Sequence, residues 1–589
     1  MLKLLNFEIL PDEIILLICQ YLRSGDIFYS LYNLNSRLNI TISGYCRYVN
    51  LMSVSYQQFQ YSVRYVLPQI GSLVRTFLLN GNWETIINKN LSLTIFGPNL
   101  SLLFPNLEIL TIKWFTTTKF LAFLKVLKNF SCLNQLNIRC LKGKSMDLIE
   151  LNLLSANDNR LDMISIDHDS SDFDISETDS SISYPNIQQL TINLIGHELI
   201  VRLFHLVPNV RCLHINTDEL LDTKDPKSTI NNLPILIHLI DFKIRSINLF
   251  WTFEEMKILL QSMPNLQQLS LDIRTNDQEF VDHEQLQTIL PSSLNKLDFF
   301  IRFYYSKSKY PDPTSIHFSS TRFPMISMLD KPRRRFLIHT IPYNQRSAIL
   351  TETISNQMPN GWFYTQRIQN LYLYDVTSVT DVLLVLQHFR QLRMLSIDIK
   401  DKSNVGKTLL FLSNFNRLKS VFCLVTQSAD LKPIELNLPY LKQIDVTGII
   451  ELTPILINAP SVDYLIIGFE CMKLLLDNNY QLITKRIVRL NVLNWIDMNS
   501  DLLVRVHASF SSLRHLVIMM KESTVVIDDF LLRILSLWNR KPRISIDVKG
   551  VLSEKIQENL RQWTVEHASI QEDYLFEVEY SDNWFDLWL

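Results

Sequence analysis

MPNLQQLSL at residues 263–271 is the phrase that decides the fold, because the sequence repeats it. FPNLEILTI stands at 104–112, YPNIQQLTI at 184–192 and VPNVRCLHI at 207–215, with weaker copies between and after them. Each copy is a turn followed by apolar-x-x-apolar-x-apolar. Within LQQLSL the last two apolar residues alternate as on a strand, so that Gln268, Ser270 and Asp272 point to the opposite side. The phrase therefore predicts one short strand per copy.

The copies recur with the period of a leucine-rich repeat. Their apolar triplets begin at Leu107, Leu133, Leu161, Ile187, Val210, Leu266, Leu294, Ile368, Leu392, Leu418, Leu441, Val462, Ile487 and Leu513. Most neighbouring intervals are 21 to 28 residues long. The intervals of 56 after Val210 and 74 after Leu294 are each close to a multiple of that period, which indicates degenerate copies around Leu236 and near Phe336.

Helical spacing precedes many of the turns. In TFEEMKILLQSM, Thr252 and Glu255 form a capping box, and an apolar stripe follows at Phe253, Met256, Leu259 and Leu260. A unit of one helix and one strand cannot cover its own apolar face, whereas stacked units bury a continuous core. The pattern over roughly residues 70 to 545 resembles the leucine-rich repeats of F-box proteins. It predicts an α/β fold: a small helical N-terminal domain followed by a curved leucine-rich-repeat-like solenoid of parallel short strands and helices.

Two short amphipathic helices are predicted near the N-terminus. LPDEIILLICQYL at 10–22 has Pro11 in the first turn, Asp12 and Glu13 at the positive helix end, and an apolar stripe. After the break at Arg23, Ser24 and Gly25, a second stripe runs from Ile27 to Leu38. Helices this short are not stable alone, so their stripes must pack on the rest of the chain or on a partner. The pattern alone leaves both alternatives open.

This segment resembles the F-box family. The resemblance is carried by Phe7, Leu10-Pro11-Asp12-Glu13-Ile14, Tyr21-Leu22, Asp26-Ile27 and Leu31 through Leu38. It implies docking on a Skp-type adaptor of a cullin-RING ubiquitin ligase. The residues expected to bind the adaptor are Leu10, Pro11, Ile14, Leu17, Ile18, Leu22, Ile27, Leu31 and Leu34.

The expected domain boundaries follow from these patterns. Residues 1–45 form the F-box-like helical domain, 46–103 a linking and N-terminal capping segment, 104–545 the repeat array, and 546–589 a C-terminal cap. The aromatic tail of this cap is expected to dock onto the last repeats, with a role as a peptide ligand as the alternative. Two segments interrupt the array: an acidic, Ser-rich loop at 167–183, and a basic and aromatic insertion at 304–335. The first is interpreted as a docking or phosphorylation loop or a solvated insertion; the second as an import signal, an acidic-peptide contact or an irregular repeat.

Composition narrows the class of protein. The 589 residues carry a formal charge of −2, which argues against nucleic acid as the main partner. Seven cysteines without a CxxC pair suit a reducing compartment, and no uncharged apolar run is long enough for a membrane span. We therefore expect a cytoplasmic or nuclear protein without membrane contact. Metalloprotease, nucleophile-elbow, dinucleotide and P-loop motifs are absent, so we expect no enzyme, no cofactor and no metal.

The resemblance thus implies the substrate-recognition subunit of a Skp-cullin-F-box type ubiquitin ligase. The alternative is a non-ligase repeat scaffold in which the N-terminal helices only cap the array. Asp272, Asp398 and Asp445 are interpreted as lying at corresponding ends of the strands, with Asp298 one position earlier; such a line of acids favours a basic partner. Strand alternation selects the candidate residues for contact with an unknown protein substrate, which are Gln189, Thr191, His214, Gln268, Ser270, Tyr372 and Ser396.

Overall fold

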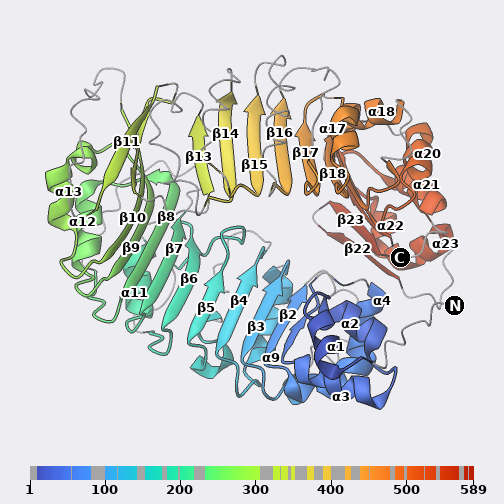
Figure 1. The fold of residues 1–589 in the computed structure, drawn as a ribbon, viewed down its shortest axis with the longest axis horizontal. Helices are drawn as coiled ribbons and strands as arrows, with labels where there is room; N and C mark the ends of the chain where they lie inside the picture. The colour runs from blue at the N-terminus through green and yellow to red at the C-terminus, as the bar shows by residue number, and fades with distance from the viewer. Residues whose placement is uncertain are drawn as a thin grey trace. The chain divides into compact units, whose positions relative to one another are not determined.

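The structure is a computed structural model (Figure 1). It describes residues 10–52, 54, 56–80, 100–115, 117–141, 153–175, 182–196, 199–217, 233–305, 323–331, 333–341, 347–351, 368–376, 386, 389, 391–399, 418–425, 438–449, 451–477, 484–496, 500–522, 524–538, 544–568, 576–581 and 583–588. The chain divides into two compact units, Met1–Ser327 with Arg335–Thr340 and Met328–Arg334 with Ile341–Leu589.

The first sheet has twelve strands in the order β1 to β10, then β12 and β11. Its strands are β1 (Tyr48–Asn50), β2 (Thr76–Asn80), β3 (Ile109–Lys113), β4 (Gln135–Arg139), β5 (Met163–Ile166), β6 (Gln189–Leu194), β7 (Cys212–Thr217), β8 (Asp241–Phe250), β9 (Gln268–Thr275), β10 (Lys296–Tyr304), β11 (Met325–Asp330) and β12 (Arg335–Thr340). Strands β1 to β10 pair in parallel, and β12 runs antiparallel to β10.

The second sheet has eleven strands in the order β13 to β21, then β23 and β22. Its strands are β13 (Ser347–Thr351), β14 (Asn370–Val376), β15 (Met394–Ile399), β16 (Ser420–Val425), β17 (Gln443–Thr447), β18 (Tyr464–Gly468), β19 (Arg489–Trp495), β20 (His515–Met520), β21 (Ser545–Lys549), β22 (Glu577–Ser581) and β23 (Trp584–Trp588). Strands β13 to β21 are parallel, while β23 pairs antiparallel with β21 and β22.

The predicted copies and the strands coincide. Each strand that follows a predicted triplet begins two residues after it, as β9 does after Leu266 and β18 after Val462. The copy around Leu236 is β8. The copy expected near Phe336 is wrong: Phe336 belongs to β12, which pairs antiparallel with β10, so the chain turns back there instead of adding a repeat. The α/β class with long parallel sheets is confirmed.

The parallel array begins earlier than the expected residue 104. Strands β1 and β2 lie within the segment 46–103 and pair in register with β3, since Thr76 stands opposite both Tyr48 and Ile109. At the other end, β23 places Phe585 and Leu587 in the core of the second sheet's edge, both without solvent exposure. The aromatic C-terminal tail is therefore a strand of that sheet.

Three helices precede β1, and the other described helices lie between the strands in sequence. In the first unit they are α1 (Asp12–Cys19), α2 (Ser24–Leu31), α3 (Ser36–Tyr45), α4 (Tyr56–Tyr61), α5 (Leu67–Ile70), α8 (Leu100–Leu103), α9 (Thr117–Leu127), α11 (Leu199–Leu206), α12 (Phe253–Gln261) and α13 (His283–Ile289), with a π-helix at Ser62–Val66 and 3-10 turns at Gly71–Leu73, Ala156–Asn159 and Gln278–Val281. In the second they are α17 (Thr453–Asn458), α18 (Phe469–Asp477), α20 (Ser500–Ser509), α21 (Asp528–Trp538), α22 (Glu554–Glu558) and α23 (Leu560–Ala568).

Helix α12 shows how a repeat closes its core. Thr252 and Glu255 form the predicted capping box, and the predicted stripe of Phe253, Met256, Leu259 and Leu260 is buried. Helices α11, α12 and α13 lie along one face of the first sheet (Figure 1). The other face, which we call the open face, carries the residues that alternate with the core of each strand.

The Pro-Asn turn owes its recurrence to hydrogen bonds between repeats. The side-chain amide of Asn265 donates to the Ile237 carbonyl at 2.8 Å, and that of Asn209 to the Pro185 carbonyl at 3.0 Å. Asn106 donates to the Ser72 carbonyl at 2.8 Å. Each amide thus satisfies a turn carbonyl of the preceding repeat. The asparagine therefore joins successive repeats at the edge where their strands begin.

Among the helices that the structure describes, every one is too short or too polar to cross a membrane.

Candidate protein-binding surfaces

The N-terminal helices form a small core of their own. Ile15 and Cys19 of α1 are fully buried, as is Ile42 of α3. The Arg37 guanidinium donates to the Asp12 carboxylate at 2.9 and 2.7 Å and to the Leu10 carbonyl, joining the start of α3 to the start of α1. Helix α1 therefore packs through a different side from the stripe noted in the sequence.

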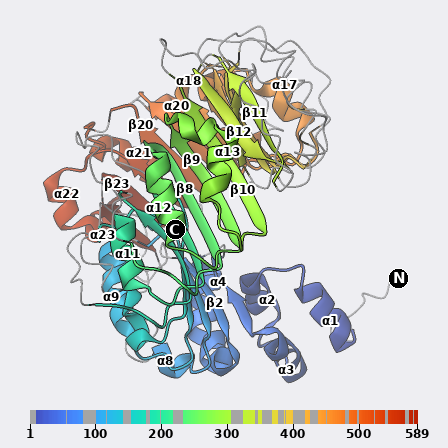
Figure 2. The same cartoon turned by 90° about the vertical axis from the view of Figure 1, so that its left-hand side faces the viewer.

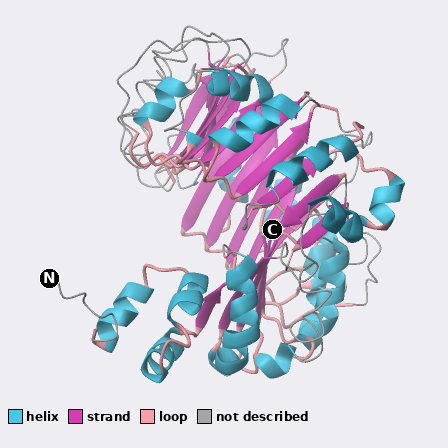
Figure 3. Cartoon of the chain, turned by 90° about the vertical axis from the view of Figure 1, so that its right-hand side faces the viewer, coloured by secondary structure: helices cyan, strands magenta, loops and turns pink. Residues whose placement is uncertain are grey.

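The predicted adaptor residues separate into two groups. Ile14, Leu17, Leu22 and Leu34 are exposed by 42, 49, 41 and 57%, and Pro11 is exposed too, whereas Leu10, Ile18 and Leu31 are half-buried and Ile27 is fully buried. We call Ile14, Leu17, Ile18 and Leu22 the α1 face, since they recur on one side of α1 and its C-terminal end. Helix α1 stands apart from the sheet, further from β2 than α2 does (Figure 2). The same separation is visible from the other side (Figure 3).

Helix α2 is built into the array. Ile27 is fully buried, the Gln58 amide donates to the Asp26 carboxylate at 2.7 Å, and the Asn50 backbone N–H donates to the Ser24 hydroxyl at 3.1 Å. A Cβ atom at Gly25 would overlap the Val54 side chain, so only glycine permits this approach. The expectation that Ile27 binds an adaptor is therefore wrong, because its side chain is fully buried within the fold.

The substrate-face candidates lie on the open faces, as strand alternation requires. Gln189 and Gln268 are exposed, and Thr191, His214 and Ser270 are half-buried. Thr191 and His214 are neighbours in register on β6 and β7, while Lys243 of β8 separates His214 from Ser270. Tyr372 and Ser396 are neighbours on β14 and β15 of the second sheet. The candidates thus form one group on each sheet.

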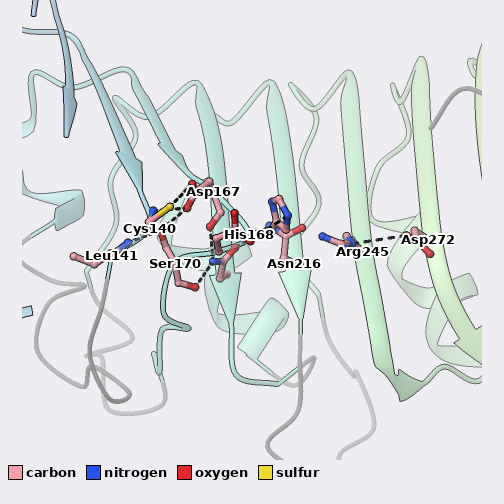
Figure 4. A network of polar contacts seen from close by, with 10 residues as sticks. Cys140, Leu141, Asp167, His168, Ser170, Asn216, Arg245 and Asp272 are labelled. Carbon is pink, nitrogen blue, oxygen red and sulfur yellow. Dashed lines mark hydrogen bonds and ion pairs between the residues drawn. The ribbon is translucent and has the colours of Figure 1, made fainter. Parts of the chain in front are cut away.

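A row of polar residues crosses the first open face from the end of β5 to the middle of β9 (Figure 4). The Asn216 amide donates to the Asn193 side-chain oxygen at 2.8 Å, and the Asn193 amide donates to the Asp167 carbonyl at 2.8 Å. Further along, Arg245 Nε lies 3.8 Å from an Asp272 carboxylate oxygen. Asn193 thus holds the loop that follows β5, since its amide also donates to the Ser170 carbonyl at 2.9 Å.

Cys140, Asp167 and Asp169 bring a thiol and two carboxylates within 4.8 Å of one another. The Asp167 carboxylate is already engaged, because it accepts from the Cys140 backbone N–H at 2.9 Å and the Ser170 hydroxyl at 2.6 Å. Burial and the Asp167 charge raise the pKa of the Cys140 thiol, which is opposite to what a metal-binding thiolate requires. This cluster fixes the first residues of the acidic segment 167–183, where Phe173 and Ile175 are buried; residues 176–181 lie outside the described residues.

The basic segment 304–335 lies partly in strands. Residues 306–322 lie outside the described residues. Tyr304 ends β10, and Lys331, Arg333 and Arg334 lie in the turn between β11 and β12, where the Arg334 backbone N–H donates to the Lys331 carbonyl at 3.1 Å. Arg335 begins β12 and is buried. Of the described residues, Arg335 is thus a strand residue and not part of a free basic tail.

The acids of the first open face have cationic partners. Asp272 contacts Arg302 Nη2 at 2.8 Å as well as Arg245, and Asp298 lies 3.6 Å from Lys296 Nζ. The expectation that these acids favour a basic partner is therefore wrong for the first sheet, because the chain's own cations neutralise them. The expected alignment is wrong as well: Asp272 and Asp398 are each the fifth residue of their strand, whereas Asp298 and Asp445 are each the third.

The second open face is more apolar. Along one row of register, Tyr372, Ser396, Phe422, Asp445 and Ile466 follow one another on β14 to β18. Burial raises the pKa of the Asp445 carboxyl to about 6. No ion pair to Asp445 occurs among the residues that the structure describes. Its neighbours on both sides, Phe422 and Ile466, are apolar.

The sequence reasoning missed Lys243, Arg245 and Arg274 of the first open face. Lys243 and Arg245 lie on β8, inside the 56-residue interval where only a degenerate copy was inferred. The signal was present, since DFKIRS at 241–246 alternates polar and apolar residues as a half-buried strand does. Recognising it would have placed Lys243 between His214 and Ser270, and Arg245 between Asn216 and Asp272.

No family model matches the sequence, and the comparison with curated proteins found no match either. Among solved structures, the crystal structure of the TLR13–ssRNA13 complex aligns at 13% identity over 81% of this chain and 71% of that chain, with a TM-score of 0.28. A leucine-rich-repeat protein of Leptospira interrogans aligns at 11% identity over 78% of this chain and 88% of its own, with a TM-score of 0.19. The chain's own strands and period define its class: a leucine-rich-repeat-like α/β array, a fold suited to binding other proteins.

Proposed function

We propose that the protein is the substrate-recognition subunit of a Skp-cullin-F-box type ubiquitin ligase, acting in the cytoplasm or nucleus. The observation that carries the proposal is the α1 face. Ile14 and Leu17 remain exposed on a helix whose other side is packed, as does Leu22 just after its C-terminal end, and all three lie in the segment that resembles an F-box. Apolar residues at helical spacing that the fold leaves uncovered favour a partner, here a Skp-type adaptor.

In this proposal the chain itself catalyses no covalent step and needs no cofactor. The α1 face attaches the protein to the adaptor, and through it to the cullin-RING ligase, while the open faces hold a protein substrate. Ubiquitin transfer is then accelerated because substrate lysines are held at a high local concentration near the charged conjugating enzyme.

A second function, a free-standing repeat scaffold, is favoured by a different observation. Helix α2 is joined to β1 through Ser24 and to α4 through Asp26, as a helix that caps the array would be. In that case the exposed side of α1 has no adaptor to meet, and the protein holds partners together without ubiquitin transfer.

Co-purification with a Skp-type adaptor separates the two functions. The intact chain is compared with the double variant Ile14→Asp, Leu17→Asp, which places two charges on the α1 face without touching the buried Ile15 and Cys19. Leu102→Asp is the matched control, because Leu102 is a leucine on another short helix and is 77% exposed.

The receptor function requires that the intact chain and Leu102→Asp retain the adaptor and that the double variant loses it while keeping its circular dichroism spectrum. If the intact chain does not retain the adaptor, or if the double variant retains it, the scaffold function replaces the proposal.

A further inference from the structure

Four cations gather on the open face of β8, β9 and β10: Lys243 and Arg245 are the third and fifth residues of β8, and Arg274 and Arg302 lie toward the C-terminal ends of β9 and β10. We call Lys243, Arg245, Arg274 and Arg302 the strand-end cluster. Register places Arg245 opposite Asp272, and Arg274 opposite Arg302. Because the strands are parallel and in register, these side chains stand in neighbouring rows of one face. Three neighbouring strands thus contribute to one cationic surface.

The charges of this surface are not balanced. On the open face of β8 to β10, Lys296 joins the four cations of the cluster, and only Asp241, Asp272 and Asp298 oppose them. Among the described residues, the carboxylate in ion-pairing contact with the cluster is that of Asp272, 2.8 Å from Arg302 and 3.8 Å from Arg245. Burial lowers the pKa of the Lys243 ammonium, although Asp272 opposes the shift. The surface therefore has a net positive charge.

Hydrogen-bond donors of the cluster are left over. The Arg302 side chain is 4% exposed, yet its Nη1 has no hydrogen-bond partner among the described residues, and the same holds for Nε of Arg274. A buried guanidinium N–H without an acceptor is costly. An oxyanion is the acceptor that a guanidinium binds best, since two parallel N–H donors match its two oxygens.

Arg274 is held ready for such a contact. Its guanidinium carbon lies 4.1 Å from the ring centroid of Phe250 and 4.3 Å from that of Tyr304. Stacking on rings fixes the plane of the guanidinium and leaves donors along its edges. Phe250 is itself 41% exposed, which adds an apolar contact beside the cations. The cluster thus combines fixed donors, excess charge and an aromatic surface.

We propose that the strand-end cluster binds an acidic segment of a protein partner, with a carboxylate or phosphate group placed against Arg245 and Arg274. The inference rests on the proposed function only in taking the open face as the surface that holds the substrate. It names the chemistry of that substrate: a segment with clustered negative charge next to an apolar side chain. It also reverses the basic partner expected from the sequence.

The test measures binding of a fluorescein-labelled peptide of consecutive glutamates to the intact chain by fluorescence anisotropy at low ionic strength. Arg245→Gln and Arg274→Gln should each weaken binding about tenfold, because each removes a charge-assisted hydrogen bond. Arg274→Lys keeps the charge but not the planar donors, so its affinity should fall between those of the wild type and Arg274→Gln. Arg139→Gln is the matched control, since Arg139 is an exposed arginine at the end of β4 on the same face.

A gain of binding provides the readout that a structural role would not give. Asp241 lies two residues before Lys243 on the same strand, and its side chain is 31% exposed. Asp241→Asn should tighten binding about twofold, because it removes an opposing carboxylate. Replacing the glutamates by phosphoserines tells which oxyanion is preferred.

The proposal is overturned if the glutamate peptide does not bind, if Arg139→Gln weakens binding as much as Arg245→Gln, or if Arg274→Gln changes nothing. Peptide binding is independent of the ligase. Loss of adaptor binding with peptide binding intact would remove the receptor function and leave the acidic-segment site, and the reverse result would remove the site alone.

Discussion

The open faces of the two sheets share a geometry and differ in chemistry. Asp298 and Asp445 occupy the same place, the third residue of β10 and of β17. Asp298 lies 3.6 Å from Lys296, the first residue of its strand, whereas the first residue of β17 is Gln443 and Asp445 has apolar neighbours in register. The paired carboxylate thus has a cation two positions away and a serine in register, and the carboxyl whose pKa is raised has neither. The scaffold fixes where side chains stand, and the alternate strand positions decide what they recognise.

The buried sides of the two sheets should respond alike. Phe204 of α11 and Phe530 of α21 are both fully buried. Phe204→Ala and Phe530→Ala should each lower the free energy of unfolding of their own unit by about 4 kcal/mol, from lost burial and the cavity left behind. Urea unfolding followed by hydrogen exchange of peptides from each unit gives both values. A difference of more than about 2 kcal/mol would show that one array is more loosely packed than the other. The open faces would then not rest on comparable scaffolds.

The paired and unpaired acids should respond differently. Asp272→Ala leaves the buried Arg302 without its counter-ion and should cost about 3 kcal/mol. Asp445→Ala at neutral pH removes a carboxylate that burial disfavours, so the stability of the second unit should hardly change or should rise. Hydrogen exchange in β9 and β10, and in β17 and β18, reports each effect locally. Equal losses at both sites would contradict the distinction between the faces.

The core could be predicted from the sequence better than the faces. The triplets beginning at Leu266 and Val462 located β9 and β18 to the residue, because buried positions admit few side chains and recur at a fixed period. The prediction of a further repeat near Phe336 failed, because an apolar run looks the same in a parallel and in an antiparallel strand. The charge of the first open face could not be read from Asp272 alone, because Arg245 and Arg302 reach it from neighbouring strands that only register brings together. Likewise, the stripe of α1 was visible, but which of its sides is packed depended on α3.

Adding a cation beside Asp445 should make the second open face resemble the first. Gln443→Lys places an ammonium where Lys296 stands beside Asp298, so it should lower the pKa of Asp445 from about 6 toward its ordinary range. A carboxyl with a raised pKa gives stability that is complete below its unfolded value of about 4 and is lost as the pH rises through about 6. The wild-type second unit should thus lose stability across this window, and Gln443→Lys should lose less.

The measurement is the urea midpoint of the second unit across that pH range, for the wild type, Gln443→Lys and Asp445→Asn. Asp445→Asn removes the titrating group and sets the background from other residues, including His515, whose pKa burial lowers to about 4. If Gln443→Lys and the wild type keep a constant difference at every pH, the charge of Asp445 is not what distinguishes the second face.

The smallest effect concerns the helices that back the sheets. Helix α12 of the first unit begins with the capping box of Thr252 and Glu255, whereas α17 of the second has Leu452 as its N-cap, without a side-chain hydrogen bond. Thr252→Ala should cost about 1 kcal/mol, because the Glu255 backbone N–H loses its acceptor. Faster hydrogen exchange in the first turn of α12, with β9 unaffected, is the expected signature.

Thr288→Ala is the control. Thr288 lies in α13, and its hydroxyl only donates to the Gln285 carbonyl of the same helix, so its loss should stay within about 0.5 kcal/mol. If both variants exchange alike, the capping box does not stabilise α12, and the N-termini of α12 and α17 do not differ in stability for that reason.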